Sequence, residues 1–545
     1  MKKTITLLTA ILFTINAFAL DVWDGSSSPW TNGSGTYDDP YLIETAENLA
    51  YLAEKVNEGY QAQGMAVFRY TYFLMTDDLD LNNINWTPIG NVNMNMQGYY
   101  FAGIFDGWYH NIDHLKIQSS ADVCGLFAGL GGEWCGIIGD DDYGQIKHLS
   151  VTNGNITTTG TGAAGIVGGV SEDGLVLQCS FSGTISVNNG GSYCGAGGVV
   201  AAAMGHARIE QCSFAGSINA TNNGGFTAAA GAGGIVGIAM DNTIVKQCYN
   251  TGAITTQAFL LNVAAGIVGA TLEENSVQIN SCYNIGTLNG NTKGGIFGMV
   301  SPINPTKGEA SIEVSNCFYL NTCGGTTNYG TSKTSAEMQT EEFKNTLDGY
   351  FHAFVMDNGT NNGYPIHSLI GFRVLEATNI TYNSAQISAD INVGNDDIAV
   401  LKLFYYDLED GYINNMYTLE LDIEDHIEVT LEDLTSETEY GYHMQFVFAD
   451  GATKSDNPQY FFTEVDGISE ISTSNISIYP NPTSDFIYID CKDATWHAST
   501  PVIIYSIDGR LIKQVDNTNI IDVRDLDNGL YLINIGNRTE RLIKR

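Results

Sequence analysis

Five cysteines recur at nearly constant spacing in this sequence and raise the first question about its chemistry. They are Cys179, Cys212, Cys248, Cys282 and Cys317, separated by 33, 36, 34 and 35 residues. Thiolates can ligate zinc, form disulfides or attack substrates, whereas a buried thiol packs as a small apolar group. Zinc sites usually use cysteine pairs within about four residues, and each of these cysteines stands alone. The spacing therefore predicts a row of free, buried thiols.

Two further cysteine pairs are candidate disulfides because they are close in sequence. Cys124 precedes Cys135, and Cys317 precedes Cys323. The signal-like N-terminus described below places the chain in a compartment where disulfides form.

The segment His110–His114 has the outline H-x-x-D-H, close to an inverted zinc-peptidase signature. That chemistry requires both histidines on one face of a helix, with Glu where this chain has Asp113. The segment instead belongs to a predicted strand, and no HExxH occurs in the chain. Metal binding at these histidines is therefore the less favoured interpretation.

Paired carboxylates of a glycosidase or lyase are also missing from the central repeats. Between Ser150 and Gly330 the only aspartates are Asp173 and Asp241, and such enzymes need acidic residues facing each other across a cleft. We assign no catalytic residue and expect no enzymatic activity. Asp77, Asp78, Asp80 and Asn395–Asp397 offer oxygen ligands for calcium, but they match no EF-hand spacing. No other cofactor is indicated.

Aromatic residues gather in the N-terminal third, where they could stack on sugars. Trp86, Trp108 and Trp134 are the candidate glycan contacts, with Asp140–Asp142 nearby. The alternative is that these rings cover the first coils of the fold, and this is the interpretation that we favour.

These side chains must be positioned by a repeating unit of about 34 residues. A G-[IV]-[VF]-G-like element accompanies each cysteine, at residues 165–168, 198–201, 234–237, 266–269 and 295–298. Gly, Val, Ile, Thr and Asn form helices poorly and strands or turns well. The repeat therefore predicts short strands in a β-solenoid, with coils stacked at about 4.8 Å. An amphipathic helix at Thr45–Asn57 would cap one end, and Ser335–Leu347 with Asn361–His367 would close the other.

The repeats resemble the GLUG repeats of bacterial surface proteins over Ala163 to Gly325, and FAGIFDGWYHNIDHLKI resembles the element that commonly precedes them. The resemblance implies a right-handed parallel β-helix. Some metallopeptidases carry GLUG repeats, but that activity does not transfer without HExxH.

From Phe372 to about Thr463, apolar and polar residues alternate, which is typical of half-buried strands. Leu434–Tyr440 (LTSETEY) resembles the tyrosine corner of fibronectin type III domains, with Ser436 at the usual proline and Tyr440 as the corner tyrosine.

The C-terminal segment resembles the type A sorting domain of the Bacteroidetes type IX secretion system. The matching residues are Tyr479, Pro480, Asn481, Pro482, Gly509, Gly529 and Tyr531. The resemblance implies export across the outer membrane, with the secretion machinery as partner, and removal of this domain. The N-terminus is consistent with export, because it resembles a secretory signal peptide. A basic start and a short apolar run precede an A-x-A site that predicts cleavage between Ala19 and Leu20. No later run is long enough to span a membrane.

The formal charge of −38 argues against nucleic acid and anionic membranes as partners. We expect an all-β chain: a signal peptide (1–19), a β-helix with its caps (20–370), an Ig-like or fibronectin III-like sandwich (372–465) and a small C-terminal sorting sandwich (476–545). The predicted function is that of a non-catalytic, secreted or cell-surface adhesin-like protein that presents a surface to an extracellular glycan or host protein. The alternative is an extracellular polysaccharide lyase or glycoside hydrolase on the same scaffold.

Overall fold

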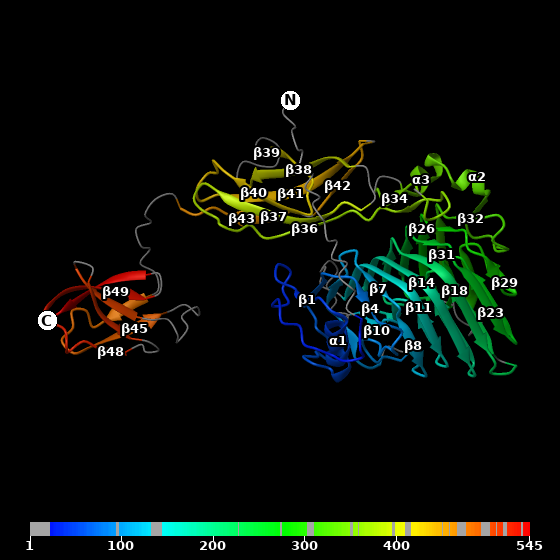
Figure 1. The fold of residues 1–545 in the computed structure, drawn as a ribbon, viewed down its shortest axis with the longest axis horizontal. Helices are drawn as coiled ribbons and strands as arrows, with labels where there is room; N and C mark the ends of the chain where they lie inside the picture. Colours follow the sequence, from blue (N-terminus) through cyan, green and yellow to red (C-terminus); the bar gives the residue numbers. More distant parts are fainter. Residues whose placement is uncertain are drawn as a thin grey trace, which may run out of the picture. The chain divides into compact units, whose positions relative to one another are not determined.

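The computed structural model shows a chain built almost wholly of β-strands (Figure 1). It describes residues 22–93, 97–131, 144–226, 228–272, 275–301, 310–348, 352–357, 359–394, 398–408, 416–449, 451–456, 458–465, 476–491, 502–507, 510–515, 520–535 and 538–545. The predicted cleavage site at Ala19 and Leu20 lies outside these residues. Among the described residues, no helix has the length and apolar character needed to cross a membrane.

The chain divides into two compact units. The first contains the solenoid and both sheets of a sandwich, and the second contains the C-terminal strands from β44 onward.

The first part of the chain is a parallel β-solenoid, as the repeats predict. Each coil passes through three sheets whose strands pair in parallel with the coils before and after. One sheet contains β2 (Ala66–Val67), β5 (Tyr100–Phe101), β10 (Phe127–Leu130), β13 (Val167–Val170), β16 (Val200–Ala203), β20 (Val236–Ala239), β25 (Val268–Leu272) and β30 (Phe297–Ser301). A second contains β9 (Val123–Cys124), β12 (Gly162–Ala164), β15 (Tyr193–Gly197), β19 (Ala229–Gly233), β24 (Leu261–Ala265) and β29 (Thr292–Gly294).

The third and largest sheet forms the face on which the candidate site lies. Its early strands are β1 (Tyr41–Ile43), β3 (Tyr72–Met75), β4 (Leu79–Asp80), β6 (Ile104–Asp106), β7 (Asn111–Asp113), β8 (Lys116–Ser119), β11 (Gln145–Thr158) and β14 (Leu175–Asn189). Its later strands are β17 (Arg208–Glu210), β18 (Ser213–Asn222), β21 (Thr243–Lys246), β22 (Tyr249–Asn250), β23 (Ala253–Ala258), β26 (Ser276–Asn280), β27 (Tyr283–Asn284), β28 (Leu288–Asn289), β31 (Ser311–Ser315), β32 (Phe318–Leu320) and β33 (Thr331–Lys333).

A left-handed residue bends this sheet at the same place in successive coils. His114, His148, Gln178, Gln211, Gln247, Ser281 and Asn316 all have φ between 51° and 55°. Each directly precedes a buried Leu or Cys of the core. A positive φ is uncommon outside glycine and is worst for β-branched residues, which fits the polar, unbranched or short side chains found at this corner.

The N-terminal end of the solenoid core is covered by helix α1 (Ala46–Glu58), which was predicted over Thr45–Asn57. Thr45 and Asn48 form a capping box, and Gly59 ends the helix with φ of 70°. The apolar face of α1 (Leu49, Leu52, Ala53, Val56) is buried in the same core as the solenoid strands.

The segment predicted to close the C-terminal end packs on the outer face of the last coils. It contains α2 (Ser335–Met338), α3 (Glu341–Asp348) and the hairpin of β34 (Phe354–Val355) with β35 (Ile366–His367). Phe343, Leu347 and Phe354 form a cluster with Tyr283 and Phe318 of β27 and β32 that is separate from the solenoid core.

The sandwich that follows is fibronectin III-like in its strand order. β36 (Gly371–Val374), β37 (Ala385–Asn392) and β40 (His426–Leu431) form one antiparallel sheet. The other holds β39 (Met416–Leu421), β38 (Ile398–Asp407), β41 (Glu439–Phe448), β42 (Thr453–Ser455) and β43 (Gln459–Phe462). Tyr440, the predicted corner tyrosine, is buried against the ring of Phe461.

The C-terminal unit is a second, smaller pair of antiparallel sheets. One holds β44 (Ile476–Tyr479), β45 (Phe486–Cys491) and β48 (Ile520–Asp522), and the other holds β47 (Leu511–Val515), β46 (Val502–Ser506), β49 (Gly529–Ile535) and β50 (Arg538–Lys544). Ile487, Ile504, Ile521, Ile533 and Leu542 are central to its core.

Candidate functional site

The structure places the recurring cysteines in one buried row inside the solenoid. Cys179, Cys212, Cys248, Cys282 and Cys317 are at most 3 % exposed. The backbone N–H of Cys212 donates to the sulfur of Cys248 at 3.4 Å, and Cys248 and Cys282 repeat this contact with the next coil at 3.3 and 3.4 Å. Burial raises the pKa of the Cys179, Cys248 and Cys317 thiols well above the ordinary value. A thiol in this state is a poor nucleophile and a poor metal ligand.

The expectation of a disulfide between Cys317 and Cys323 is wrong, because both are free. Cys317 Sγ points along the row, 3.1 Å from the carbonyl of Ser315, while Cys323 Sγ accepts from the backbone of Gly325 at 3.3 Å. Cys124 is also free and buried, and its candidate partner Cys135 lies outside the described residues.

The histidines of the H-x-x-D-H segment flank strand β7 and not a helix. His110 Nδ1 lies 3.1 Å from Asp78 Oδ1, and His114 Nδ1 lies 3.0 Å from Asp80 Oδ1. These two calcium candidates are thus engaged by histidines of the next coil. Within the described part of the chain, no group of three or more His, Cys, Asp or Glu side chains converges as a metal site would require. Asn395–Asp397 lie outside that part.

Trp86, one of the candidate glycan contacts, is buried and cannot stack on a sugar. It is 1 % exposed, its Nε1 donates to the carbonyl of Leu126, and its ring packs on Trp23 at 5.3 Å. Trp108 is half-buried, with its ring 6.0 Å from that of Tyr109. Trp134 and Asp140–Asp142 lie outside the described residues.

A short segment that we call the strap, residues 361–370, crosses the outer face of the large sheet. Its backbone carbonyls and one imidazole bind side chains and carbonyls of successive coils. Pro365 O accepts from Tyr283, His367 Nε2 lies 2.8 Å from Gln247 O, Ser368 O accepts from Gln178 at 2.9 Å, and Ile370 O accepts from Tyr109 at 3.1 Å. The strap therefore runs from the later coils toward the earlier ones and leads into strand β36.

Tyr109 and His148 stand where the strap meets the sandwich. Their rings stack with centroids 4.6 Å apart. His148 Nδ1 lies 2.9 Å from Asp106 Oδ1, and Lys147 Nζ lies 3.3 Å from Asp106 Oδ2. Burial alone would raise the pKa of Asp106, but the charges and donors of His148 and Lys147 and the N–H of Trp108 hold it well below its usual range.

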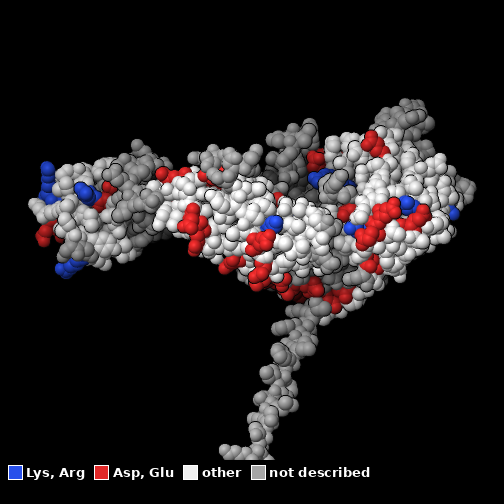
Figure 2. Space-filling view, turned by 90° about the horizontal axis from the view of Figure 1, so that it is seen from above, with Lys and Arg blue, Asp and Glu red and all other residues white. Residues whose placement is uncertain are grey.

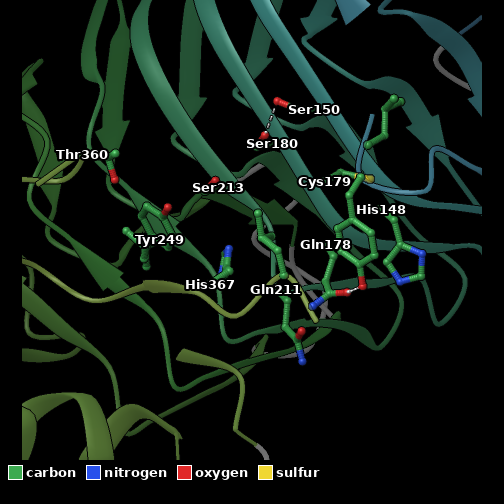
Figure 3. Close-up of a pocket in the computed structure, with 14 residues that line it drawn as sticks. His148, Ser150, Gln178, Cys179, Ser180, Gln211, Ser213, Tyr249, Thr360 and His367 are labelled. Carbon is green, nitrogen blue, oxygen red and sulfur yellow. Dashed lines mark hydrogen bonds between the residues drawn. The ribbon is translucent and has the colours of Figure 1, made fainter. Parts of the chain in front are cut away.

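A pocket of about 240 Å³ opens beside this cluster, between the strap and the large sheet (Figure 3). Its walls carry amide, hydroxyl and imidazole groups on successive coils, including Gln178, Gln211, Ser180 and His367. The Tyr109 hydroxyl donates to Gln178 Oε1 at 3.1 Å. The Ser180 hydroxyl donates to that of Ser150 at 3.0 Å, a bond drawn as a dashed line in Figure 3. Its polar groups bind one another and the strap.

A larger cavity of about 560 Å³, which we call the groove, lies on the other side of Tyr109. Its floor is formed by β6, β11, β14 and β17 of the solenoid, and its wall by β36, β42 and β43 of the sandwich. The lining residues are Tyr37, Tyr72, Ile104, Tyr109, Gln145, Lys147, His148, Leu175, Leu177, Gln178, Arg208, Gln211, Ile370, Gly371, Phe372, Val374, Lys454, Asp456 and Gln459.

The floor of the groove has a regular side-chain register. Gln145, Leu175 and Arg208 are direct partners on β11, β14 and β17, and Lys147 and Leu177 are partners in the neighbouring row. Adjacent strands are about 4.8 Å apart, so the floor offers polar, apolar and basic positions at a fixed step. The half-buried rings of Tyr37 and Tyr72 meet edge to face at 5.6 Å beside it.

The charge of the groove differs from that of the chain. Acidic side chains outnumber basic ones over the face seen in Figure 2, as the composition of 61 acidic and 23 basic residues requires. The groove, by contrast, is lined by Lys147, Arg208 and Lys454, with Asp456 as its one lining carboxyl. Burial raises the pKa of Asp456 to about 7. Its Oδ2 atom is buried and has no hydrogen-bond partner in the described part of the chain.

Neither the groove nor the strap was found from the sequence. Their contacts join residues 190 and 261 positions apart, and the strap carries no repeat. No signal in the sequence singles out Lys147 and Arg208, because Lys246 occupies the same side-chain row as Lys147 and lies outside the groove.

The described sorting-motif residues lie at the end of β44, in the entry segment that follows it, and in β49 of the small C-terminal unit. Asn481 donates to Arg541 O at 2.6 Å and accepts from the N–H of Ile543 at 2.9 Å, which ties the entry segment to β50. Tyr479 is exposed and stacks on Tyr488. Pro480 and Pro482, which follow it in the sequence, are also exposed. Gly529 begins β49, and Tyr531 donates to Asp527 O at 2.8 Å. Gly509 lies outside the described residues.

Comparisons with known proteins each cover a part of the chain. A putative Gly-rich membrane protein of Evansella cellulosilytica is 32 % identical over 170 residues, which are 30 % of this chain and 17 % of that protein. The chain thus spans about a sixth of this curated relative.

Among solved structures, the sensor domain of the anti-sigma factor RsgI4 in Pseudobacteroides cellulosolvens is similar at 21 % identity over 18 % of this chain and 95 % of that one, with a TM-score of 0.15. A segment of two fibronectin type III domains from chicken tenascin is similar at 14 % identity over 31 % of this chain and 97 % of that one, with a TM-score of 0.14. These structural similarities are too weak to indicate a function.

Residues 477–545, however, match the family of secretion system C-terminal sorting domains, which indicates that the type IX secretion system exports this chain to the cell surface or the extracellular space.

Proposed function

We propose that the exported chain is a non-catalytic, adhesin-like binding protein that holds an extracellular glycan in the groove. The observation that carries the proposal is the groove itself. It has a volume of about 560 Å³, polar, apolar and basic side chains at a fixed step across β11, β14 and β17, and tyrosine rings beside them. Ring faces stack on the C–H faces of sugars, and amides exchange hydrogen bonds with hydroxyl groups.

The architecture suits a binding domain that is joined to a cleavable export signal. In this proposal the solenoid is of the GLUG type, the sandwich is a spacer that also forms one wall of the groove, and the secretion machinery is the partner of the C-terminal unit. A host protein is the alternative ligand, because an extended peptide would also fit between a sheet face and a strand edge.

The binding test uses the full chain on an array of glycans and extracellular proteins, with two matched variants. Gln145→Trp fills the floor of the groove, whereas Gln278→Trp places the same ring in the same side-chain row four coils away, at an exposed position outside the groove. We expect the array signals to disappear in the first variant and persist in the second. No signal from the unmodified chain, or equal loss in both variants, would refute the proposal.

Export has its own test. Deleting residues 475–545 should abolish surface delivery in the native host, as measured by protease accessibility on intact cells. Full surface delivery of the truncated chain would show that the C-terminal unit is not the export signal.

A second candidate function is that of an extracellular polysaccharide lyase or glycoside hydrolase. It is favoured by the pairing of His148 with Asp106 beside Lys147 and Tyr109 at the edge of the groove, because lyases combine a proton acceptor with a cation that neutralises the substrate carboxylate. Incubation with a polysaccharide panel decides: new reducing ends or unsaturated products would replace the binding proposal, and binding without turnover would support it.

A further inference from the structure

The basic side chains of this acidic chain are not spread evenly. Only 23 Lys and Arg residues face 61 Asp and Glu residues, yet Lys147, Arg208 and Lys454 line a single groove. Charged side chains with low-dielectric walls focus the local field. The groove is therefore a place where a negatively charged ligand can approach a chain that otherwise repels it.

The spacing of these cations suits a ligand that carries repeated charges. Lys147 lies on β11 and Arg208 on β17, with β14 between them, so they are about 10 Å apart along the stack of coils. Leu175 and Leu177 of β14 form an apolar floor between them. Lys454 faces them from β42 of the sandwich, where its Nζ donates to Ile370 O at 2.8 Å.

Two of these cations, Arg208 and Lys147, have more donors than their carboxylate partners use. Arg208 binds Glu210 through Nε at 2.9 Å, and a guanidinium has two further nitrogens that suit a carboxylate. Lys147 contacts Asp106 at 3.3 Å, and an ammonium has three donors.

Alternating charged and apolar positions fit a glycan better than an acidic peptide. A sugar unit combines a carboxylate edge with a C–H face, and Leu175, Leu177 and the rings of Tyr37 and Tyr72 offer surfaces for such faces. A peptide would instead bind mainly through the backbone edge of a strand, which would not use the step of charged and apolar side chains on the floor.

We infer that the groove selects polyanionic glycans, with the carboxylates of successive uronic acid units bound by Lys147, Arg208 and Lys454. The inference rests on the proposed glycan-binding function and narrows it to one class of ligand.

The test is a titration of the full chain with polygalacturonate oligomers and with the same oligomers after reduction of their carboxyl groups. We expect the acidic oligomers to bind and the reduced ones to bind at least tenfold more weakly, and the affinity to fall as NaCl rises from 50 to 500 mM. Alginate and hyaluronan oligomers extend the test to other uronates, and poly-glutamate tests an acidic peptide.

Matched variants locate the site. Arg208→Gln and Lys454→Gln should each weaken binding about tenfold, the effect of losing one charge-assisted hydrogen bond. Lys246→Gln removes the same charge from the same sheet face one coil beyond Arg208, outside the groove, and should leave the affinity unchanged.

The outcomes separate the inference from the function on which it rests. Groove-dependent binding of neutral glycans alone, equal binding of reduced and acidic oligomers, or equal loss in all three variants would overturn the inference while leaving glycan binding in place. Binding of poly-glutamate without any uronate would assign the groove to an acidic peptide and overturn it as well. If no glycan of any kind binds the chain, both the inference and the proposed function fail.

Discussion

His148 Nδ1 lies 2.9 Å from Oδ1 of Asp106, a residue of the preceding coil, at the edge of the groove. Because an ionised carboxylate can only accept, the imidazole donates through Nδ1–H, which leaves Nε2 as an acceptor. Burial lowers the pKa of His148, so the ring is neutral at pH 7. The groove is thus bordered by a fixed, neutral imidazole and an ionised aspartate held by Lys147.

Replacing Asp106 with Asn should destabilise the chain by about 1–3 kcal/mol at pH 7, because the partly exposed Lys147 and the imidazole of His148 would lose their carboxylate partner. The folded-state pKa of Asp106 is depressed, so its contribution is present above pH ~4 and is lost as the pH falls further. Guanidinium unfolding at pH 7 and pH 3 measures both effects.

Asp241→Asn, at an exposed corner of the solenoid, is the control and should change the free energy of unfolding by less than about 0.5 kcal/mol. An equal loss for Asp106→Asn at both pH values would mean that packing, and not charge, explains the effect.

The strap should loosen in mild acid because of His367. Burial lowers the pKa of this imidazole to about 4, and Nε2 lies 2.8 Å from Gln247 O. The folded-state value lies below the unfolded one of about 6.5, so the stabilisation is complete above pH ~6.5 and is lost as the pH falls toward 4, by up to about 3 kcal/mol.

His367→Gln keeps a donor but cannot titrate, and it should flatten the dependence of unfolding free energy on pH between 7.5 and 4.5. His206→Gln, at an exposed position, should reproduce the profile of the unmodified chain. A profile unchanged by His367→Gln would exclude this imidazole as the titrating group.

Cys248 of the thiol row should be chemically silent and structurally sensitive. Cys248 is fully buried between Cys212 and Cys282, so Cys248→Ser should cost about 1–3 kcal/mol through a poorly paired hydroxyl. Peptide mass spectrometry should find Cys248 unmodified after exposure of the native chain to a thiol reagent and modified after denaturation. Rapid labelling in the native chain would show that the row is accessible.

The solenoid could be predicted because its evidence is periodic. Each glycine element and each cysteine recurs once per coil, so burial of one copy implies burial of the others, and Leu115 and Leu149 continue the row toward the N-terminus. Non-periodic features could not be predicted in this way. Nothing local marks Ser368 as a partner of Gln178 or Ile370 as a partner of Tyr109. Aromatic clustering in the sequence does not distinguish a core from a binding face, and only the structure shows that Trp86 is buried against Trp23.

The left-handed corner was missed because its residue types vary while its conformation does not. Gln211 has φ of 52° and is one of seven such residues. Gln211→Gly relieves the strain, whereas Gln211→Val places a β-branched side chain there, so the valine variant should be less stable than the glycine variant by about 1–2 kcal/mol. Thermal or chemical unfolding of the two variants gives this difference directly, and equal stabilities would contradict the assigned backbone conformation.

Hydrogen–deuterium exchange of the full chain, with and without the glycan that gives the strongest array signal, tests the position of the binding site most directly. If the groove holds the ligand, exchange should slow in peptides covering residues 368–374 and 453–459, which form its wall. Slowed exchange confined to residues 223–226 and 258–261, where the exposed rings of Phe226 and Phe259 meet at 4.7 Å, would instead place the ligand on the far turns of the solenoid and contradict the groove as the binding site.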